Sequence, residues 1–273
     1  MFSTAPTSTA PVPSRAAIDA PAATPLLHTH AHNDYLHEHP LFDALSHRFS
    51  SVEADVWLTD DGRLLVGHDK DALHHLERTL QALYLDPLQA LVHAHGGHVY
   101  ADSTAALQLL VDVKNTGTQT YLALDRLFRG RYGSMLTSWT GGVEQPGAIR
   151  VIISGDRDRT LMESQTQRYA AYDGRLSDLG TGAAVGLIPL ISDNCDNAFA
   201  WKGVGEMPGD QRDHLQAIVA RAHADGQEVR FSNTPDRSPS KYLDFWREEL
   251  SAGVDWLNTD LLGALETFLT PFG

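Results

Sequence analysis

The sequence contains a single cysteine, Cys195, and few basic residues: 21 Lys and Arg stand against 35 Asp and Glu. One cysteine excludes an internal disulfide framework and a multi-cysteine zinc or iron–sulfur site. The formal net charge of −14, without a long basic run, argues against nucleic acid and anionic bilayers as partners. No apolar run approaches the roughly 18 residues of a membrane span. These absences predict a globular chain with no nucleic-acid partner and no transmembrane segment.

The first 25 residues differ in composition from the rest. Residues 1–25 are dominated by Ala, Pro, Ser and Thr, which predicts a disordered or wrapped N-terminal segment. This segment lacks the basic and apolar regions of a signal peptide. It resembles the spacer that often remains after signal cleavage, so we expect a secreted protein, although a cytoplasmic one fits the same residues. Residues 26–273 are predicted to form one domain.

Short β-rich segments alternate with helical ones from Leu26 onward, which is typical of βα units around a parallel sheet. Helices are expected at Thr79–His93, Gln119–Phe128, Gln211–Ala224 and Lys241–Ala252, and an extra strand at Arg63–Val66. Eight strands in about 248 residues predict a single TIM-type (β/α)₈ barrel, expected to be a monomer. The expected strands are Leu26–His30, Ser51–Trp57, Leu109–Val113, Arg150–Ser154, Tyr169–Tyr172, Gly186–Ile191, Glu228–Ser232 and Trp256–Asn258.

Two acidic residues interrupt the apolar segment Ser51–Trp57. Glu53 and Asp55 stand two positions apart, so a strand presents both carboxylates on one face. Burying two carboxylates together is costly unless a positive charge compensates them. One divalent cation with hard oxygen ligands, Mg²⁺ or Ca²⁺, is the simplest compensation. Salt bridges on a solvated face, or paired charges in the core, are the alternative interpretation.

Asp112 and Lys114 repeat this spacing at the end of another expected strand. The active sites of barrel enzymes form at the carboxyl ends of the strands. Two polar pairs at strand ends therefore favour a site over isolated surface salt bridges.

Six of the 14 histidines lie between residues 28 and 47, and His28 and His30 form an H-x-H pair. Zinc amidohydrolases and phosphoesterases of the polymerase-and-histidinol-phosphatase type begin in this way, but their sites need further His and carboxylate ligands later in the chain. The second half offers only two histidines, His214 and His223, both within an expected surface helix, so the zinc interpretation lacks its other ligands. His68 follows a turn and a short strand, directly after the Glu53 segment. An imidazole at this position suits proton transfer during in-line phosphodiester cleavage.

Several motifs together resemble the phospholipase-C-like phosphodiesterase superfamily, which includes glycerophosphodiester phosphodiesterases, phosphoinositide phospholipases C and sphingomyelinases D on TIM-type barrels. The resemblance is strongest to the branch of the altered inheritance of mitochondria protein 6-like proteins and covers about Leu26 to Leu262. The motifs are His32-Asn33-Asp34-Tyr35-Leu36, Val52-Glu53-Ala54-Asp55-Val56-Trp57, Gly67-His68-Asp69, Leu80-Gln81-Ala82-Leu83-Tyr84-Leu85-Asp86-Pro87-Leu88, Leu109-Leu110-Val111-Asp112-Val113-Lys114 and Trp256-Leu257-Asn258-Thr259-Asp260.

This resemblance implies roles for the residues in these motifs. His32 and His68 would form the general acid–base pair, and Lys114 would hold a phosphate oxygen. The metal ligands would be Glu53, Asp55, Asp112 and, by the pattern of the phosphoinositide phospholipases C, Asn33. The implied substrate is a small-molecule or lipid phosphodiester, cleaved in some relatives through a cyclic phosphate.

The sequence also departs from the superfamily. The H-R-G and E-N-T motifs of the glycerophosphodiester phosphodiesterases are absent, and Ser232 stands where relatives tend to carry a Trp. The head-group preference therefore does not follow from the resemblance. Arg230 and Asn233, on the same strand and just after it, are candidate substrate contacts.

Three functions remain as hypotheses. The first is a metal-dependent phosphodiesterase of glycerophosphodiesters or (lyso)phospholipids. The second is a lyase of phospholipase C or sphingomyelinase D type that releases a cyclic phosphate. The third is a non-catalytic barrel that binds phosphate or a lipid head, since a fold does not fix a function. Product analysis separates the first two, and any metal-dependent turnover excludes the third.

Overall fold

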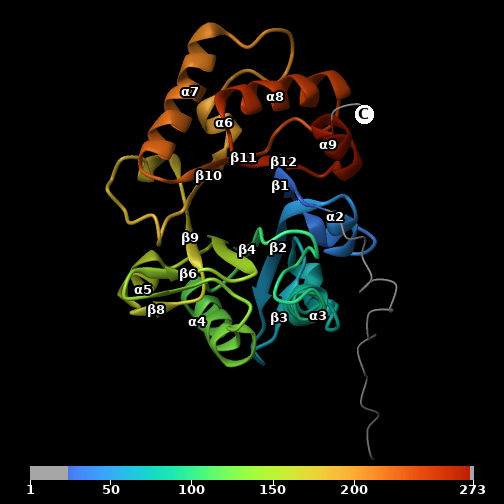
Figure 1. The fold of residues 1–273 in the computed structure, drawn as a ribbon, viewed down its shortest axis with the longest axis vertical. Helices are drawn as coiled ribbons and strands as arrows, with labels where there is room; N and C mark the ends of the chain where they lie inside the picture. The colour runs from blue at the N-terminus through green and yellow to red at the C-terminus, as the bar shows by residue number, and fades with distance from the viewer. Residues whose placement is uncertain (1–23, 271–273) are drawn as a thin grey trace, which may run out of the picture.

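The computed structural model describes residues 24–270, so the predicted N-terminal segment 1–25 lies outside the described residues except for its last two. Eight parallel strands follow one another around a barrel in the order β12-β1-β2-β4-β7-β9-β10-β11 (Figure 1). A parallel bridge between Arg230 of β11 and Trp256, just before β12, closes the circle. The predicted TIM-type barrel is therefore confirmed. The strands are β1 (Leu26–Ala31), β2 (Phe49–Leu58), β4 (Leu107–Val113), β7 (Ile149–Gly155), β9 (Ala171–Gly174), β10 (Leu190–Asn194), β11 (Glu228–Ser232) and β12 (Leu257–Thr259).

Helices follow most of the strands and cover the outside of the barrel. Figure 1 shows α7 and α8 on one side of the strands and α3 and α4 on the other. The α-helices are α2 (Phe42–Ser46), α3 (Asp86–Ala94), α4 (Gly117–Leu127), α5 (Arg159–Ser164), α6 (Cys195–Ala198), α7 (Gly209–Ala224), α8 (Pro239–Ala252) and α9 (Leu262–Leu269). Shorter helical turns are η1 (Asp34–Leu36), η2 (Lys70–His74), η3 (Gln81–Leu85), η4 (Phe128–Tyr132) and η5 (Leu176–Asp178).

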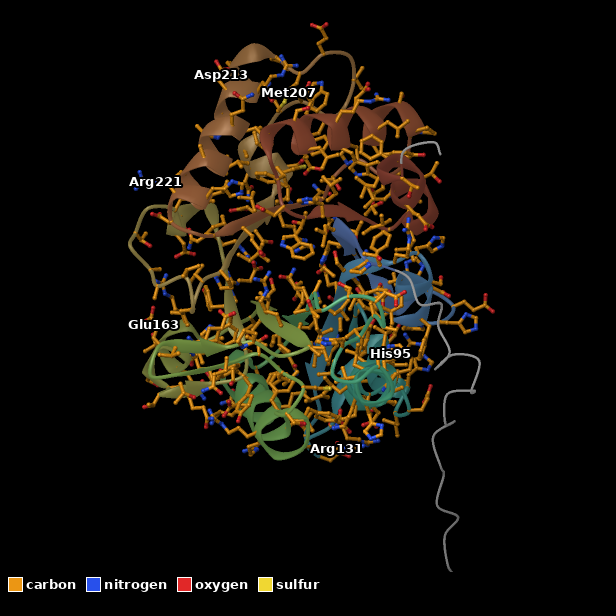
Figure 2. All side chains as sticks on the ribbon, viewed as in Figure 1. His95, Arg131, Glu163, Met207, Asp213 and Arg221 are labelled. Carbon is orange, nitrogen blue, oxygen red and sulfur yellow. The ribbon has the colours of Figure 1, made fainter. Side chains whose placement is uncertain are left out.

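Local sequence explains where several helices begin and end. Asp158 accepts a hydrogen bond from the Leu161 amide and caps the start of α5. Gly253 ends α8 in the left-handed region at φ 86°, a conformation that costs glycine little. None of the helices within residues 24–270 is long and apolar enough to cross a bilayer. Charged side chains such as Arg131, Asp213 and Arg221 lie on the outer surface (Figure 2).

Side chains alternate between the inside and the outside of the barrel along each strand. On β4, Leu109, Val111 and Val113 belong to the large core between strands and helices, whereas Leu110 packs with Ile152 inside the barrel. Polar side chains fill the lower layer of the interior, where Arg150 pairs with Gln108 and Glu228. The interior is therefore packed, and open space is left at its upper, carboxyl end.

The expected elements agree with the structure at most positions. The extra strand is β3 (Leu64–Val66), which pairs antiparallel with β2. The strand expected at Gly186–Ile191 begins instead at Leu190, because Pro189 has no amide to donate and the apolar residues before it form a turn. The helix expected at Thr79–His93 is divided into the π-helical turn η3 and α3.

One unit was not predicted at all. The strands β5 (Ser138–Thr140), β6 (Val143–Gln145) and β8 (Gln167–Arg168) form a small antiparallel sheet outside the barrel. They are two or three residues long, which is too short for a period-two pattern to be visible in the sequence. Trp139 of this sheet is buried, and the Arg168 guanidinium lies over its ring, 5.2 Å from the ring centre.

Candidate active site

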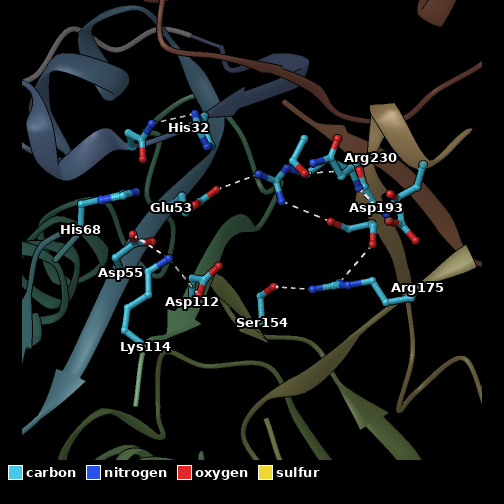
Figure 3. A pocket seen from close by; sticks show the side chains of 15 residues that line it. His32, Glu53, Asp55, His68, Asp112, Lys114, Ser154, Arg175, Asp193 and Arg230 are labelled. Atoms are coloured by element: carbon cyan, nitrogen blue, oxygen red, sulfur yellow. Dashed lines mark hydrogen bonds and ion pairs between the residues drawn. The ribbon is translucent and has the colours of Figure 1, made fainter. Parts of the chain in front are cut away.

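A polar pocket of about 380 Å³ opens at the carboxyl ends of the strands (Figure 3). This is the end at which the loops of a TIM barrel build active sites, and the volume lies in the range of small-molecule sites. The pocket is lined by His32, Asn33, Glu53, Asp55, His68, Asp112, Lys114, Ser154, Arg175, Ser192, Asp193, Asn194, Asn197, Arg230 and Ser232.

Three carboxylates meet in this pocket. Glu53 and Asp55 point inward from β2, and Asp112 stands opposite Asp55 in the register of β2 with β4. One oxygen of each lies within 4.8 Å of one oxygen of the other two. Gly155 at the end of β7 leaves room for them, because a Cβ there would lie 2.3 Å from Asp112 Oδ1. The predicted acidic residues are thus brought together.

Two cationic side chains, Lys114 and Arg230, contact the three carboxylates but do not balance their negative charge. Lys114 Nζ lies 2.9 Å from Asp55 Oδ2 and 3.3 Å from Asp112 Oδ1, and Arg230 donates to Glu53 Oε2 at 2.7 Å. Burial and the charge of Glu53 raise the pKa of Asp55 to about 7, and burial also raises the pKa of Asp112. Burial would raise the pKa of Glu53 as well, but Arg230 and His30 together lower it.

The second oxygen of Asp55, Oδ1, is buried and has no hydrogen-bond partner among the residues that the structure describes. A buried carboxylate oxygen without a donor is costly unless something positive occupies its open side. Three clustered carboxylates with one such oxygen fit a divalent cation that prefers oxygen ligands, such as Mg²⁺ or Ca²⁺.

Asn33 is connected to the three carboxylates by Tyr35, a buried residue of η1. The Tyr35 hydroxyl is 2.7 Å from Asp55 Oδ2 and 2.8 Å from Asn33 Oδ1, so its single proton serves one of them at a time. Asn33 itself adopts the left-handed region at φ 50°, which Asn tolerates better than most residues. The Asn33 carbonyl oxygen therefore lies on the side of the acidic group.

His32 follows β1 and is held from behind by Asp260. Its Nδ1 lies 2.7 Å from Asp260 Oδ1, which leaves Nε2 for other contacts. Burial would lower the pKa of His32, but the hydrogen bond to Asp260 and the charge of Glu53 outweigh it and raise that pKa. A carboxylate on the rear nitrogen fixes the ring and stabilises an imidazolium, as it does in the His–Asp pairs of serine proteases.

His68 enters the pocket from the loop after β3. The Gly67 amide donates to the Asp55 carbonyl at 3.1 Å, and Trp57 Nε1 donates to the Gly67 carbonyl at 2.9 Å. These bonds tie the loop to β2. In Figure 3, His32 and His68 lie on the same side of the pocket as Glu53 and Asp55.

Most of the predicted site residues, including Arg230, line this one pocket. Asn233 does not line it; its amide donates to Asn194 Oδ1 at 3.2 Å. Of the H-x-H pair, His28 is exposed and contacts the Asp255 carbonyl, and His30 is buried between Ser51 and Glu53. Neither of these two histidines lines the pocket. Burial and the Arg230 charge lower the pKa of His30 to about 3.

Some residues of the site were not foreseen as functional. Asp260 and Tyr35 belong to motifs that were recognised, but their contacts depend on how β12 and η1 approach β1 and β2. Arg175, Ser154 and Asp193 carry no motif and come from three different strands or strand ends. A polar residue at the carboxyl end of each expected strand is the signal that could have found them.

Comparison with known proteins agrees with the motifs. A protein-family model described as the AIM6-like phosphodiesterase domain matches residues 21–173, more than half of the chain. The altered inheritance of mitochondria protein 6 of Kluyveromyces lactis is 35% identical, over 88% of this chain and 71% of that protein. The homolog in Arthroderma benhamiae is 30% identical, over 88% and 82%. The Lachancea thermotolerans protein is also 30% identical, but this chain covers only 63% of its length.

Solved structures with the same fold include a glycerophosphoryl diester phosphodiesterase from Parabacteroides distasonis, with a TM-score of 0.50 and 14% identity over 92% of this chain and 89% of that chain. A glycerophosphodiester phosphodiesterase from Agrobacterium tumefaciens gives a TM-score of 0.50 and 12% identity over 90% and 99%. At such identities the likeness concerns the fold alone. The predicted superfamily and branch are confirmed, and the chain belongs to the family of AIM6-like phosphodiesterase domains.

Proposed function

We propose that this protein is a phosphodiesterase that depends on one divalent cation, Mg²⁺ or Ca²⁺, and cleaves a glycerophosphodiester or (lyso)phospholipid. One observation carries the proposal. Three clustered carboxylates, two histidines and two cations line the same pocket at the carboxyl end of the barrel. Each group has a task in phosphoryl transfer, and membership of the family agrees with that chemistry.

Glu53, Asp55 and Asp112 would hold the cation, with Asn33 as a further oxygen ligand. When bound, the cation would neutralise the charge that develops on the phosphoryl oxygens. The charge balance of the pocket supports this assignment. The three carboxylates exceed Lys114 and Arg230 by one negative charge, which repels an anionic diester until a divalent cation is added.

His32 is the proposed general base. Its Nε2 takes the proton of the attacking hydroxyl while the new O–P bond forms, and Asp260 stabilises the resulting imidazolium. His68 is the proposed general acid and gives its proton to the leaving oxygen as the old P–O bond breaks. Lys114 then holds a phosphoryl oxygen, because its ammonium already reaches the carboxylates around which the phosphate would sit.

The attacking hydroxyl can belong to water or to the substrate. Attack by a substrate hydroxyl beside the phosphate yields a cyclic phosphate, and its release without hydrolysis would make the protein a lyase of the phospholipase C or sphingomyelinase D type. The same residues serve both reactions, so only the product distinguishes them.

Phosphorus NMR of the purified protein with glycerophosphodiesters, lysophospholipids and sphingomyelin tests the proposal. We expect turnover with Mg²⁺ or Ca²⁺, none after EDTA, and recovery when the cation is returned. An open-chain monoester identifies the hydrolase, and a cyclic phosphate identifies the lyase. Cation binding by calorimetry without turnover of any diester would contradict the proposal and favour a binding barrel.

A further inference from the structure

A chain of polar side chains runs through the inside of the barrel and ends at Glu53. It is here called the polar column and consists of Arg150, Gln108, Ser51 and His30, of which the last three are buried. The interior of a TIM barrel is usually filled by branched apolar side chains. Burying polar groups there is costly unless hydrogen bonds satisfy them, so the presence of the column needs an explanation.

The polar column is continuous from its lower end to the pocket. Arg150 Nη2 donates to Gln108 Oε1 at 3.0 Å, and Gln108 Nε2 donates to Ser51 Oγ at 3.0 Å. Ser51 Oγ lies 2.7 Å from His30 Nδ1, and His30 Nε2 lies 3.0 Å from Glu53 Oε2. Hydrogen bonds therefore connect the lower layer of the interior to a proposed cation ligand.

The two ends of the column fix the direction of each hydrogen bond between them. A guanidinium only donates, so Gln108 turns its oxygen to Arg150 and its amide N–H to Ser51. The Ser51 hydroxyl accepts from Gln108, and among the described residues its own proton has only His30 Nδ1 as an acceptor. At the other end, the Glu53 carboxylate only accepts, so His30 Nε2 carries a proton. The column therefore selects one tautomer of His30, with the proton on Nε2.

The same arrangement distinguishes the two oxygens of Glu53. His30 Nε2 and Arg230 Nη2 both contact Oε2, at 3.0 and 2.7 Å, and Figure 3 shows the contact with Arg230. Arg230 is itself fixed, because its Nε and Nη2 donate to Asn258 Oδ1 at 3.0 and 2.7 Å. Within residues 24–270, no hydrogen bond reaches Oε1 of Glu53. One oxygen is thus held from two sides, and the other is left for a further partner.

We propose that His30 is a positioning residue of the cation site: its Nε2–H, aligned by the polar column, holds Glu53 Oε2 and leaves Oε1 for the cation. Two fixed donors on Oε2 set the rotation of the carboxylate before a cation binds, as outer hydrogen bonds do for metal ligands in general. His30 does not line the pocket, so it acts through Glu53. The inference rests on the cation dependence of the proposed function and adds a residue that this dependence requires.

The first test is the tautomer of His30 in the natural chain without a cation. NMR of nitrogen-15-labelled histidine separates protonated from unprotonated ring nitrogens, and His30→Gln identifies the signals of His30 among the 14 histidines. At pH 7 we expect the proton on Nε2 and an unprotonated Nδ1 that accepts a hydrogen bond. A proton on Nδ1 would overturn the inference, and this measurement requires neither cation binding nor turnover.

The second test measures the affinity for Mg²⁺ and for Ca²⁺ by calorimetry. His30→Leu removes the donor and should weaken binding by about 10- to 100-fold, the usual effect of losing an outer hydrogen bond of a metal ligand. His30→Gln keeps an N–H donor and should recover most of the affinity. His75→Leu is the matched control, because His75 lies beside Glu77 on the surface, and it should bind like the natural chain. Equal affinity in His30→Leu and the natural chain would contradict the positioning role.

The third test reverses the column from outside the pocket. In Gln108→Glu, the new carboxylate accepts from Arg150 and also from the Ser51 hydroxyl. The Ser51 oxygen then accepts from His30 Nδ1, and the Nε2 lone pair faces Glu53. We expect the affinity for the cation to fall by about tenfold or more and Nδ1 to become protonated.

Gln216→Glu, on the exposed surface of α7, adds the same charge away from the column. Negative charge alone attracts a cation, so this control should bind at least as tightly as the natural chain. Binding by Gln108→Glu that is as tight as in this control would overturn the inference. A natural chain that bound neither cation would contradict the proposed function, whereas a proton on Nδ1 or full affinity of His30→Leu contradicts the positioning role alone.

Discussion

Two glutamates are buried to the same degree in different regions of this barrel. Glu53 at the mouth is 4% exposed, and Glu249 on α8, outside the strands, is 1% exposed. Glu53 accepts hydrogen bonds from Arg230 and His30, and these lower its pKa against the effect of burial. Within residues 24–270, both oxygens of Glu249 lack a hydrogen-bond partner, and burial raises its pKa well above the usual range.

The difference between Glu53 and Glu249 shows how a buried carboxylate in a candidate active site differs from one that is buried without a partner. At the mouth, each buried carboxylate contacts a cationic side chain. One negative charge remains in excess, which a bound metal cation would neutralise. Around Glu249, most neighbours are apolar or aromatic, among them Phe199, Trp201 and Phe245, and the charge of Asp236 opposes its ionisation further. No carboxylate is expected to stay ionised there without cost. Burial alone therefore does not mark a functional residue; the surroundings of the charge do.

The largest effect should follow the loss of the charge of Glu53. Glu53→Gln keeps the shape but removes a proposed ligand and leaves Arg230 without an anion. We expect kcat/KM to fall by about 10³-fold, in line with the loss of an electrostatic group at a reacting phosphate. Phosphorus NMR measures the loss of turnover, and calorimetry measures the loss of cation affinity.

Glu163→Gln is the matched control, because Glu163 pairs with Arg159 on the surface of α5. It should change neither cation affinity nor turnover. If Glu53→Gln bound the cation as tightly as the natural chain and kept its activity, the acidic group would not be the metal site.

A smaller loss of catalytic rate is expected when Asp260 is replaced. Asp260→Asn keeps a polar group behind His32 but removes the negative charge that orients and stabilises its imidazolium form. We expect kcat to fall by about 10- to 100-fold, within the range for general acid–base groups, with KM nearly constant. Steady-state kinetics separate the two constants.

His47 and Glu266 offer a matched pair outside the pocket, since His47 Nδ1 lies 2.7 Å from Glu266 Oε2. Glu266→Gln should leave kcat unchanged. A rise in KM with constant kcat in Asp260→Asn would instead place Asp260 in substrate binding and exclude the positioning role.

Replacement of Glu249 should change stability rather than activity, and its effect should depend on pH. Because the pKa of Glu249 is raised in the folded protein, ionisation of this residue opposes folding. Its penalty is absent below the ordinary carboxyl pKa and grows as the pH rises toward the folded value. Glu249→Met should therefore raise the free energy of unfolding by about 1–3 kcal/mol at pH 8, and by less at pH 5.

For Glu248, on the same helix, we expect the opposite pH dependence of stability. Arg212 lowers the pKa of Glu248, so its small contribution is present at neutral pH and lost as the pH falls. Glu248→Gln should slightly destabilise the protein at pH 8 and have no effect at low pH. Thermal unfolding of both variants between pH 3 and 8 tests both expectations; a pH-independent gain in Glu249→Met would contradict an ionising Glu249.

The sequence predicted the parts of this comparison that depend on short-range pattern. The period of two along β2 places Glu53 and Asp55 together, and the βα alternation predicts the barrel that brings Asp112 beside them. The unpaired state of Glu249 depends on how α8 packs against its neighbours, which one helix does not encode. The contact of Asp260 with His32 likewise joins residues 228 positions apart at the closing edge of the barrel.

The smallest effect concerns Asn233, a candidate substrate contact on the same segment as Arg230. Its amide donates to Asn194 Oδ1, and its backbone lies in the left-handed region at φ 59°. Asn233→Gly keeps that conformation available at no steric cost and removes only the side chain. We therefore expect kcat/KM to stay within about twofold, the lower end of the effect of one neutral hydrogen bond, and thermal stability to change little. Asn233→Ala would strain the same backbone, so a loss confined to Ala reports conformation. A loss of tenfold or more in the Gly variant would instead make Asn233 a substrate contact, which requires its loop to turn toward the pocket when a diester binds.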